Sequence, residues 1–228
     1  MKWHNPLRDL SRFEKTLWGC SMLTVTAVFA LSGAGDILTL IASLIGATAL
    51  IFVAKGYVLG QVLTVVFAVF YGIISFYFRY FGEMITYLCM TAPIAVTSVI
   101  SWVRHPYADS KEVTVSSITK SQMIRMFCLA AVVTAMFYFI LGALGNENLA
   151  FSTLSITTSF LASYLTVLRS PYYALAYAAN DIVLIVLWTL ASLEDTSYLP
   201  MVACFFIFLC NDAYGFFNWQ RMRKRQSA

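Results

Sequence analysis

The sequence predicts an all-α integral membrane protein with eight transmembrane helices. Of its 228 residues, 60% are hydrophobic and only 11% are charged, and the mean hydropathy is +0.76. A soluble domain carries about 25% charged residues, so these charges are too few to cover a globule in water. Breaks marked by charges, Gly or Pro also divide the chain into apolar runs of about 20 residues, the length that crosses a bilayer. Both observations argue against a soluble enzyme.

The apolar runs are separated by short breaks, except for one long polar stretch at residues 104–121. The five cysteines are odd in number, lie in apolar runs and lack CxxC spacing, so they indicate neither a disulfide framework nor a zinc site. No cofactor or metal is expected. The predicted spans are residues 16–33, 36–53, 57–79, 82–103, 122–144, 149–168, 172–193 and 198–219.

The basic residues predict how the chain is oriented in the membrane. If all eight runs span, every Lys and Arg except Arg79 falls on the side of the N-terminus. The positive-inside rule makes that side cytoplasmic, so we expect both termini in the cytoplasm. The run 16–33 also fits a signal peptide, but its loss would place the two basic termini on opposite sides. The far side would hold Asp36, Glu83, Glu147, Glu194 and Asp195.

An internal repeat is indicated when the second half is slid over the first by 117 positions. This slide places Tyr71 on Trp188, Met84 on Met201 and Trp102 on Trp219. It predicts two parallel three-helix repeats joined by one linker helix, with an extra helix in front. Parallel repeats recur in secondary transporters, whose substrate site lies between them near the midplane. The predicted segments are 1–35 (N-terminus and extra helix), 36–103 (first repeat), 104–148 (loop and linker helix), 149–220 (second repeat) and 221–228 (basic cytoplasmic tail).

Polar residues inside the predicted spans indicate a cavity. An Asp at the centre of a spanning helix costs about 2.5 to 3.5 kcal/mol on insertion scales, so Asp181 and Asp212 must face protein or water. Both carboxyls are equally compatible with a structural role. Helical spacing places Tyr177 and Trp188 on the same face of the helix as Asp181. The candidate binding residues are Gln61, Tyr71, Tyr177, Asn180, Asp181, Trp188, Asn211 and Asp212. They suit a neutral or cationic ligand with an aromatic ring.

Other polar and aromatic residues are interpreted as structural. Ser and Thr stripes commonly form helix-packing faces, and we expect this of Ser152, Ser155, Ser159 and Ser163. Trp102 and Trp219 lie beside basic residues at predicted helix ends, a position typical of membrane-interface anchors. Asn218 shares that end.

Residues 198–224, YLPMVACFFIFLCNDAYGFFNWQRMRK, resemble the C-terminal helix of the PnuC family of bacterial nicotinamide riboside transporters. The resemblance rests on YGFxNW followed by basic residues. Residues 93–105, PIAVTSVISWVRH, form a degraded counterpart in which Ala95, Ser98 and Ser101 replace the family's Gln, Gly and Asn. Asn180 followed by Trp188 also matches the family. The resemblance covers residues 36–224.

The resemblance implies a fold similar to the SWEET sugar exporters, a bacterial inner membrane and a homotrimer. It also implies uptake of nicotinamide riboside, a vitamin B3 form, by facilitated diffusion. The two repeats favour alternating access as the mechanism, in which they rock about a site near the midplane. Trp188 and Tyr71 would then stack on the cationic pyridinium ring, and Asn211 and Asn180 would bond its carboxamide or ribose. We expect the phosphorylated nucleotide to be excluded, because the cavity residues offer no cation to its phosphate.

Other functions remain open to different degrees. A proton-coupled carrier, in which Asp181 or Asp212 titrates, is the main alternative. An integral-membrane enzyme is disfavoured because no His/Asp/Glu cluster of ligand spacing is visible, and short loops leave little room for the output domain of a sensor. Nucleic acid is not an expected partner, since the excess of basic residues lies in short loops and at the two ends.

Overall fold

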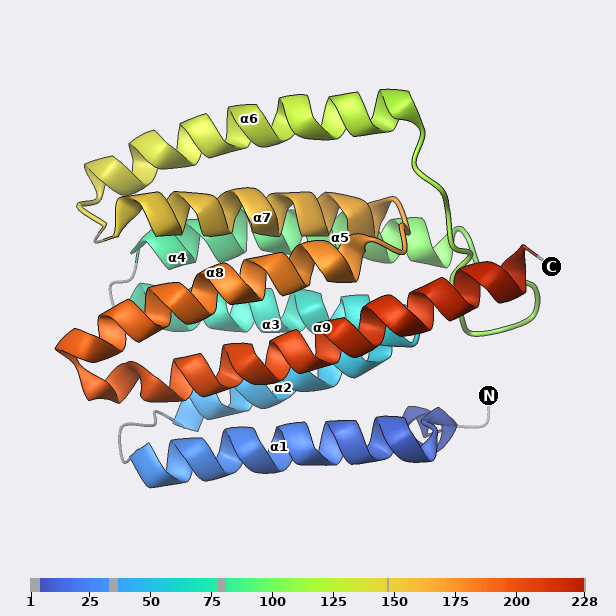
Figure 1. Ribbon diagram of the computed structural model, residues 1–228, viewed down its shortest axis with the longest axis horizontal. Coiled ribbons are helices and arrows are strands. Elements are labelled where there is room, and N and C mark those ends of the chain that lie inside the picture. Colours follow the sequence, from blue (N-terminus) through green and yellow to red (C-terminus); the bar gives the residue numbers. More distant parts are fainter. Residues whose placement is uncertain (1–4, 33–36, 78–80, 147, 228) are drawn as a thin grey trace.

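The structure is a computed structural model that describes residues 5–32, 37–77, 81–146 and 148–227, and its long helices run side by side (Figure 1). Lys2, Asp36, Arg79 and Glu147 lie outside the described residues, as does the predicted boundary between residues 35 and 36. Short helical segments cover Pro6–Asp9, Thr86–Thr91 and Thr196–Tyr198. The longer helices are α1 (Arg12–Ser32), α2 (Ile37–Ala54), α3 (Val58–Tyr77), α4 (Phe81–Ile85), α5 (Ala92–Val103), α6 (Lys120–Ala143), α7 (Leu149–Val167), α8 (Tyr173–Glu194) and α9 (Leu199–Gln226).

Seven helical stretches within the described residues are long and apolar enough to cross a membrane. They are α2, α3, the stretch Phe81–Val103, α6, α7, α8 and α9. Helix α1 is of similar length, but Arg12, Glu14 and Lys15 occupy its first turn. The helices follow the predicted runs to within a few residues, with one exception. The basic segment after residue 220, predicted to be a tail, continues α9 as helix through Gln226.

The stretch Phe81–Val103 is interrupted by a π-helical turn at Thr86–Thr91. The backbone N–H of Ala92 donates to the carbonyl of Tyr87, five residues back. Pro93 follows and has no N–H to donate, so the regular hydrogen-bond ladder cannot continue through this point. π-Turns of this kind occur frequently at functional sites.

Two helix ends have the same backbone geometry. At the end of α2, Gly56 has a φ of 74°, and Tyr57 N–H donates to Phe52 O. At the end of α7, Arg169 has a φ of 56°, and Ser170 N–H donates to Leu165 O. Both are Schellman-type ends, which favour Gly at the left-handed position. The structure therefore holds a non-glycine residue in the strained position of one of two matching turns.

The contacts between helices close a ring in the order α2, α3, α5, α7, α8, α9 and back to α2. Helix α6 packs outside the ring on α7, and α1 packs outside it on α2 and α9, as Figure 1 shows. The ring divides into two sets, α2, α3 and α5, and then α7, α8 and α9. The last helix of each set contacts the first helix of the other set.

Both described termini lie at the same end of the bundle as the loop of residues 104–119 (Figure 1). We call this the loop end. The connections 143–149 and 194–199 lie at the opposite end. The loop-end connection between α2 and α3 contains Tyr57, where burial, together with the charges of Asp9, Glu112 and Glu14, raises the pKa of the phenol to about 12.

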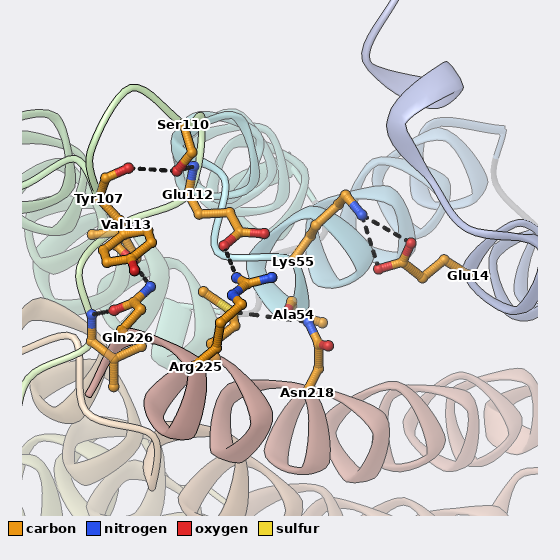
Figure 2. Close-up of polar contacts among 12 residues, drawn as sticks. Glu14, Ala54, Lys55, Tyr107, Ser110, Glu112, Val113, Asn218, Arg225 and Gln226 are labelled. Atoms are coloured by element: carbon orange, nitrogen blue, oxygen red, sulfur yellow. Dashed lines mark hydrogen bonds and ion pairs between the residues drawn. The ribbon is translucent and has the colours of Figure 1, made fainter. Parts of the chain in front are cut away.

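Side chains from α9 hold the 104–119 loop against the bundle. Figure 2 shows the Arg225 guanidinium paired with the Glu112 carboxylate and the Gln226 amide bonded to Val113 O. Gln226 Oε1 also accepts from Val115 N–H at 2.7 Å. The loop backbone contacts both helix sets, because Val113 N–H donates to Gly56 O and Ser116 N–H donates to Arg169 O. The loop therefore joins the two matching turns.

Candidate substrate-binding site

A cavity of about 560 Å³ lies inside the helix ring. Its volume falls in the range of about 300 to 1,000 Å³ that is typical of small-molecule sites. Residues of α2, α3, α4, α7, α8 and α9 line it, together with Asn146, Asn148 and Tyr198 from connections at the opposite end. The cavity therefore extends toward the opposite end of the bundle.

Aromatic rings from two sides of the ring line the cavity. On one side Phe67, Tyr71 and Tyr87 form a cluster, with the two tyrosine ring centroids 4.6 Å apart. On the other side the Trp188 and Tyr198 centroids are 5.4 Å apart. The π-helical turn carries Tyr87, so the interruption of that span supplies one of these rings. Such a wall suits a flat aromatic ligand.

Polar side chains between the aromatic groups are held in place by α7. Thr158 bonds the Asn180 amide oxygen at 2.8 Å, and Ser163 bonds the Tyr177 hydroxyl at 3.0 Å. Both hydrogen bonds join α7 to α8. Because Asn180 is 7% exposed and fixed by Thr158, the remaining capacity of its amide is available to a ligand in the cavity.

The charges in the cavity are acidic. The lining includes the carboxyls of Glu83, Asp181, Glu194, Asp195 and Asp212, and none of the described lining residues is Lys, Arg or His. Asp181 and Asp212 are 4% exposed and lie within hydrogen-bonding reach of one another. Asp181 Oδ2 has no hydrogen-bond partner among the described residues. Such a site attracts cations and repels anions.

The loop end of the ring is filled by aromatic side chains rather than open. Trp102 and Trp219 are both 0% exposed, and Tyr173 is 1% exposed. Trp102 Nε1 donates to Thr166 O, and Trp219 Nε1 donates to Val53 O, each at 2.9 Å. The interpretation of both tryptophans as membrane-interface anchors was therefore wrong. An indole ring suits both a membrane interface and a buried position between helices. Only the packing of the opposite helix set shows that these two tryptophans are buried.

Comparison with known proteins identifies the family. Residues 36–221 match the family model described as "Nicotinamide mononucleotide transporter". This chain belongs to that family. It is accordingly a multi-pass membrane transporter and not an enzyme.

Two curated relatives in this family carry the name nicotinamide riboside transporter PnuC. The protein of Neisseria mucosa is 25% identical over 222 residues, which cover 95% of this chain and 84% of the relative. That of Haemophilus influenzae is 24% identical over 190 residues, which cover 82% and 81%. A crystal structure titled as that of the vitamin B3 transporter PnuC aligns with a TM-score of 0.80 and 23% identity, covering 95% of this chain and 94% of that one. It shows that the folds agree.

The structure brings together all but one of the residues that the sequence suggested for this transporter's site. Gln61, Tyr71, Tyr177, Asn180, Asp181, Trp188 and Asp212 line the cavity. Asn211 does not, because its side chain points out of the ring toward α1 and donates to Ser21 Oγ at 3.0 Å. It also donates to Ile207 O.

The serine row of α7 was expected to be a packing face, but most of it faces the cavity. Ser152, Ser155 and Ser159 are lining residues, and Ser163 bonds Tyr177, which lines the cavity too. The reason is that α7 packs on α6 with its other side, where Thr157 bonds Thr134 at 2.7 Å. A stripe of small polar residues does not reveal which of the two sides faces a cavity.

Several lining residues of this transporter were not found from the sequence as site residues. They include Phe67, Glu83, Tyr87, Glu194, Asp195 and Tyr198. Glu194 and Asp195 were assigned to a loop and Glu83 to the start of a span, because charged residues were used to mark where spans end. Tyr87 lies in the π-helical turn, where regular helical spacing fails. The signal in the sequence for an irregular turn was Pro93, which has no backbone N–H to donate.

Proposed function

We propose that this chain takes up nicotinamide riboside across a bacterial inner membrane by facilitated diffusion. The observation that carries this proposal is the cavity itself, which combines stacked aromatic rings with carboxylates and holds no described Lys, Arg or His. Nicotinamide riboside presents a flat cationic pyridinium ring, a carboxamide and ribose hydroxyls. Trp188 and Tyr71 would stack on the ring, with cation–π contacts worth about 2 kcal/mol when desolvated.

The remaining polar groups of the ligand have partners in the same cavity. Asn180 and Gln61 would bond the carboxamide or the ribose hydroxyls, because both amides lie in the lining. The Asp181 and Asp212 carboxyls would offset the pyridinium charge, and Tyr177 would supply a further hydroxyl. The structure gives no support for direct contact by Asn211, whose side chain bonds α1.

The phosphorylated nucleotide is excluded in this proposal. The family description names the mononucleotide, whereas the curated relatives are named for the riboside. A phosphate adds nearly two negative charges at neutral pH. In the cavity it would meet Glu83, Asp181 and Asp212 with no cation among the described lining residues. This electrostatic mismatch favours the riboside.

Alternating access is supported by the asymmetry of the two ends. The cavity extends to the opposite end of the bundle, while Trp102, Trp219 and Tyr173 fill the loop end. In our proposal the loop end is cytoplasmic, as its basic residues and the positive-inside rule suggest. The substrate then enters from outside and leaves when the two helix sets rock apart at the loop end. No chemical step is involved, and phosphorylation in the cytoplasm would trap the product.

The same proposal includes the finer architecture. The ring contacts support a SWEET-like 3+1+3 arrangement, with α2, α3 and α4/α5 as one repeat, α6 as linker, and α7, α8 and α9 as the other. Helix α1 would be an eighth span, because it runs alongside α2 and brings the N-terminus to the loop end, where the C-terminus lies (Figure 1). Both termini are then cytoplasmic. A homotrimer follows from the family resemblance alone, and light scattering of the purified protein tests it.

Calorimetry on detergent-purified protein tests the substrate. We expect nicotinamide riboside to bind and nicotinamide mononucleotide, riboflavin and thiamine not to bind. Trp188→Ala is expected to abolish binding, since it removes a stacking face. Binding of the mononucleotide with equal or higher affinity would overturn the proposal, as would a folded protein that binds none of the four ligands.

A second candidate function is proton-coupled transport, and one contact favours it. Asp181 and Asp212 lie within hydrogen-bonding reach, and two carboxyl groups form a hydrogen bond only with a proton between them. Release of that proton during transport would couple uptake to a pH gradient. Uptake driven by an imposed pH gradient in liposomes, and lost in both Asp181→Asn and Asp212→Asn, would favour this carrier over the uniporter.

A further inference from the structure

Glu83 lies in the cavity, although the sequence placed it at the start of a span and did not suggest it as a site residue. It belongs to α4, just before the π-helical turn, and lines the cavity together with Tyr71 and Tyr87. The side chains of Tyr71 and Ser75 on α3 lie within hydrogen-bonding reach of its carboxyl group. Ser75 is 2% exposed, so it is a rigid partner. Glu83 is therefore held in one position, beside a ring proposed to stack on the substrate.

Glu14 is a buried carboxylate with a structural role, and its partners differ from those of Glu83. Glu14 is 3% exposed and pairs with Lys55 at 3.0 Å, while Tyr214 donates to it at 2.8 Å. Figure 2 shows this ion pair between α1 and Lys55, the residue that follows α2. Glu83 has the same kind of hydroxyl donors but lies in a cavity whose described lining contains no cation. Its charge is available to a ligand.

A second carboxyl in the same cavity also points to a cationic ligand. Asp181 is 4% exposed and lines the cavity, and its Oδ2 atom has no partner among the described residues. A buried acceptor without a partner costs free energy unless a ligand or water satisfies it. Asp181 and Asp212 lie on α8 and α9, whereas Glu83 lies on α4. The cavity thus presents negative charge from both helix sets.

We infer that Glu83 is a specificity-determining residue, whose carboxylate favours a cationic ring over an uncharged ring of the same shape. The inference rests on the proposed function, because it assigns part of the selectivity of that same site. In this inference Glu83 has two roles. Its charge attracts the cationic ring of the ligand, and its contact with Tyr71 positions the tyrosine ring. A positioning role alone would affect charged and uncharged ligands equally, so the two roles separate by experiment.

The test compares nicotinamide riboside with its dihydro form, which has the same carboxamide and ribose but no charge. Binding of each to purified wild-type protein and to Glu83→Gln is measured by calorimetry. The Gln side chain keeps an oxygen that accepts from Tyr71 and Ser75 and removes only the charge. We expect Glu83→Gln to weaken binding of the cation about tenfold, the equivalent of about 1.4 kcal/mol, and to leave the dihydro ligand unchanged.

Two control variants make the result specific. Asp109→Asn makes the same chemical change in the exposed 104–119 loop, and we expect it to alter neither affinity. Glu83→Asp retains the charge and is expected to keep the preference for the cation, even where Glu83→Gln lowers the Tm. Equal weakening of both ligands in Glu83→Gln, or no weakening of either, would overturn the inference.

A second ligand pair separates this inference from the proposed function. If wild-type protein binds neither riboside, the substrate proposal fails, and 1-methylnicotinamide, a cation, is compared with uncharged nicotinamide. A preference for the methylated cation that is lost in Glu83→Gln would support the role of Glu83 without the riboside. The absence of any preference in wild-type protein would overturn that role.

Discussion

The indole rings of Trp102 and Trp219 lie 5.4 Å apart between centroids, and each donates its N–H to the helix set opposite its own. The residue before each tryptophan does the same. Ser101 donates to Val167 O, next to Thr166, and Asn218 donates to Ala54 O, next to Val53. Figure 2 shows the Asn218 bond. The loop end is thus closed by two matching pairs of hydrogen bonds.

Removing either indole N–H should weaken the loop end by a similar amount. Trp102→Phe and Trp219→Phe each delete one buried hydrogen bond, at a cost of about 0.5 to 1.5 kcal/mol. The Thr166 and Val53 carbonyls still accept the backbone N–H groups of Arg169 and Gly56. We expect similar decreases in Tm, measured in detergent. Trp18→Phe, which deletes a partly buried bond from α1 to Thr48, serves as the control and should have a smaller effect. A large decrease in only one of the Trp102 and Trp219 variants would contradict their equivalence.

Asn211 should matter for stability and not for binding. Its amide joins α9 to Ser21 of α1, outside the cavity. We expect Asn211→Ala to lower the Tm, because hydrogen bonds of this kind contribute about 0.5 to 1.5 kcal/mol, and to leave the Kd for nicotinamide riboside unchanged. Gln61→Ala is the matched comparison, since this amide lines the cavity, and it should raise the Kd. A higher Kd in Asn211→Ala with an unchanged Tm would place Asn211 in the site.

The two matching turns should respond in opposite directions to substitution. Gly56→Ala puts a Cβ 2.6 Å from Met222 Cε and in the left-handed region, so the Tm should fall. The strain alone costs about 1 to 2 kcal/mol. Arg169→Gly relieves that strain and removes a guanidinium whose Nε has no described partner and whose pKa is lowered by burial. We expect a Tm at or above that of the wild type. A marked decrease would show that Arg169 makes a stabilising contact.

The Gln226 side chain should govern the order of the 104–119 loop. Gln226→Ala removes the acceptor of Val115 N–H and the donor to Val113 O. Hydrogen–deuterium exchange should become faster at Val115 than at Ser116, whose N–H still bonds Arg169 O. Arg225→Ala removes an exposed ion pair with Glu112, and such pairs contribute only about 0 to 1 kcal/mol. Equal exchange in both variants would mean that the amide is not the anchor.

The positions of the long helices were predictable because apolar runs and the charges, Gly or Pro between them indicate where helices begin and end, and α2 to α9 follow the predicted runs. Tyr177, Asp181 and Trp188 line one cavity, as their helical spacing suggested, because α8 is regular throughout. Tyr87 was missed because the π-turn before Pro93 breaks that regularity. Asn211 bonds α1 instead of lining the cavity, because α9 contacts α1 as well as the ring. Spacing along one helix does not tell which neighbour a side chain meets.

The slide that indicates a repeat agrees only in part with the hydrogen bonds of the structure, for a related reason. A slide of 117 positions aligns Trp102 with Trp219, but it places Val53 on Ser170 rather than on Thr166, the residue with the matching hydrogen bond. The first helices of the two sets therefore need a different offset from the last helices. The sequences of α2 and α7 contain no matching pair of aromatic residues that would reveal this second offset. The carbonyls of Val53 and Thr166 reveal it, because they accept the matching indole hydrogen bonds.

Transport assays on purified protein in liposomes test the account most directly. Labelled nicotinamide riboside and nicotinamide mononucleotide are supplied outside the vesicles, with no ion gradient. We predict that the riboside equilibrates across the membrane, that Trp188→Ala abolishes this uptake, and that the mononucleotide stays outside. Uptake of the mononucleotide at a comparable rate, or riboside uptake only under an imposed gradient, would contradict the account.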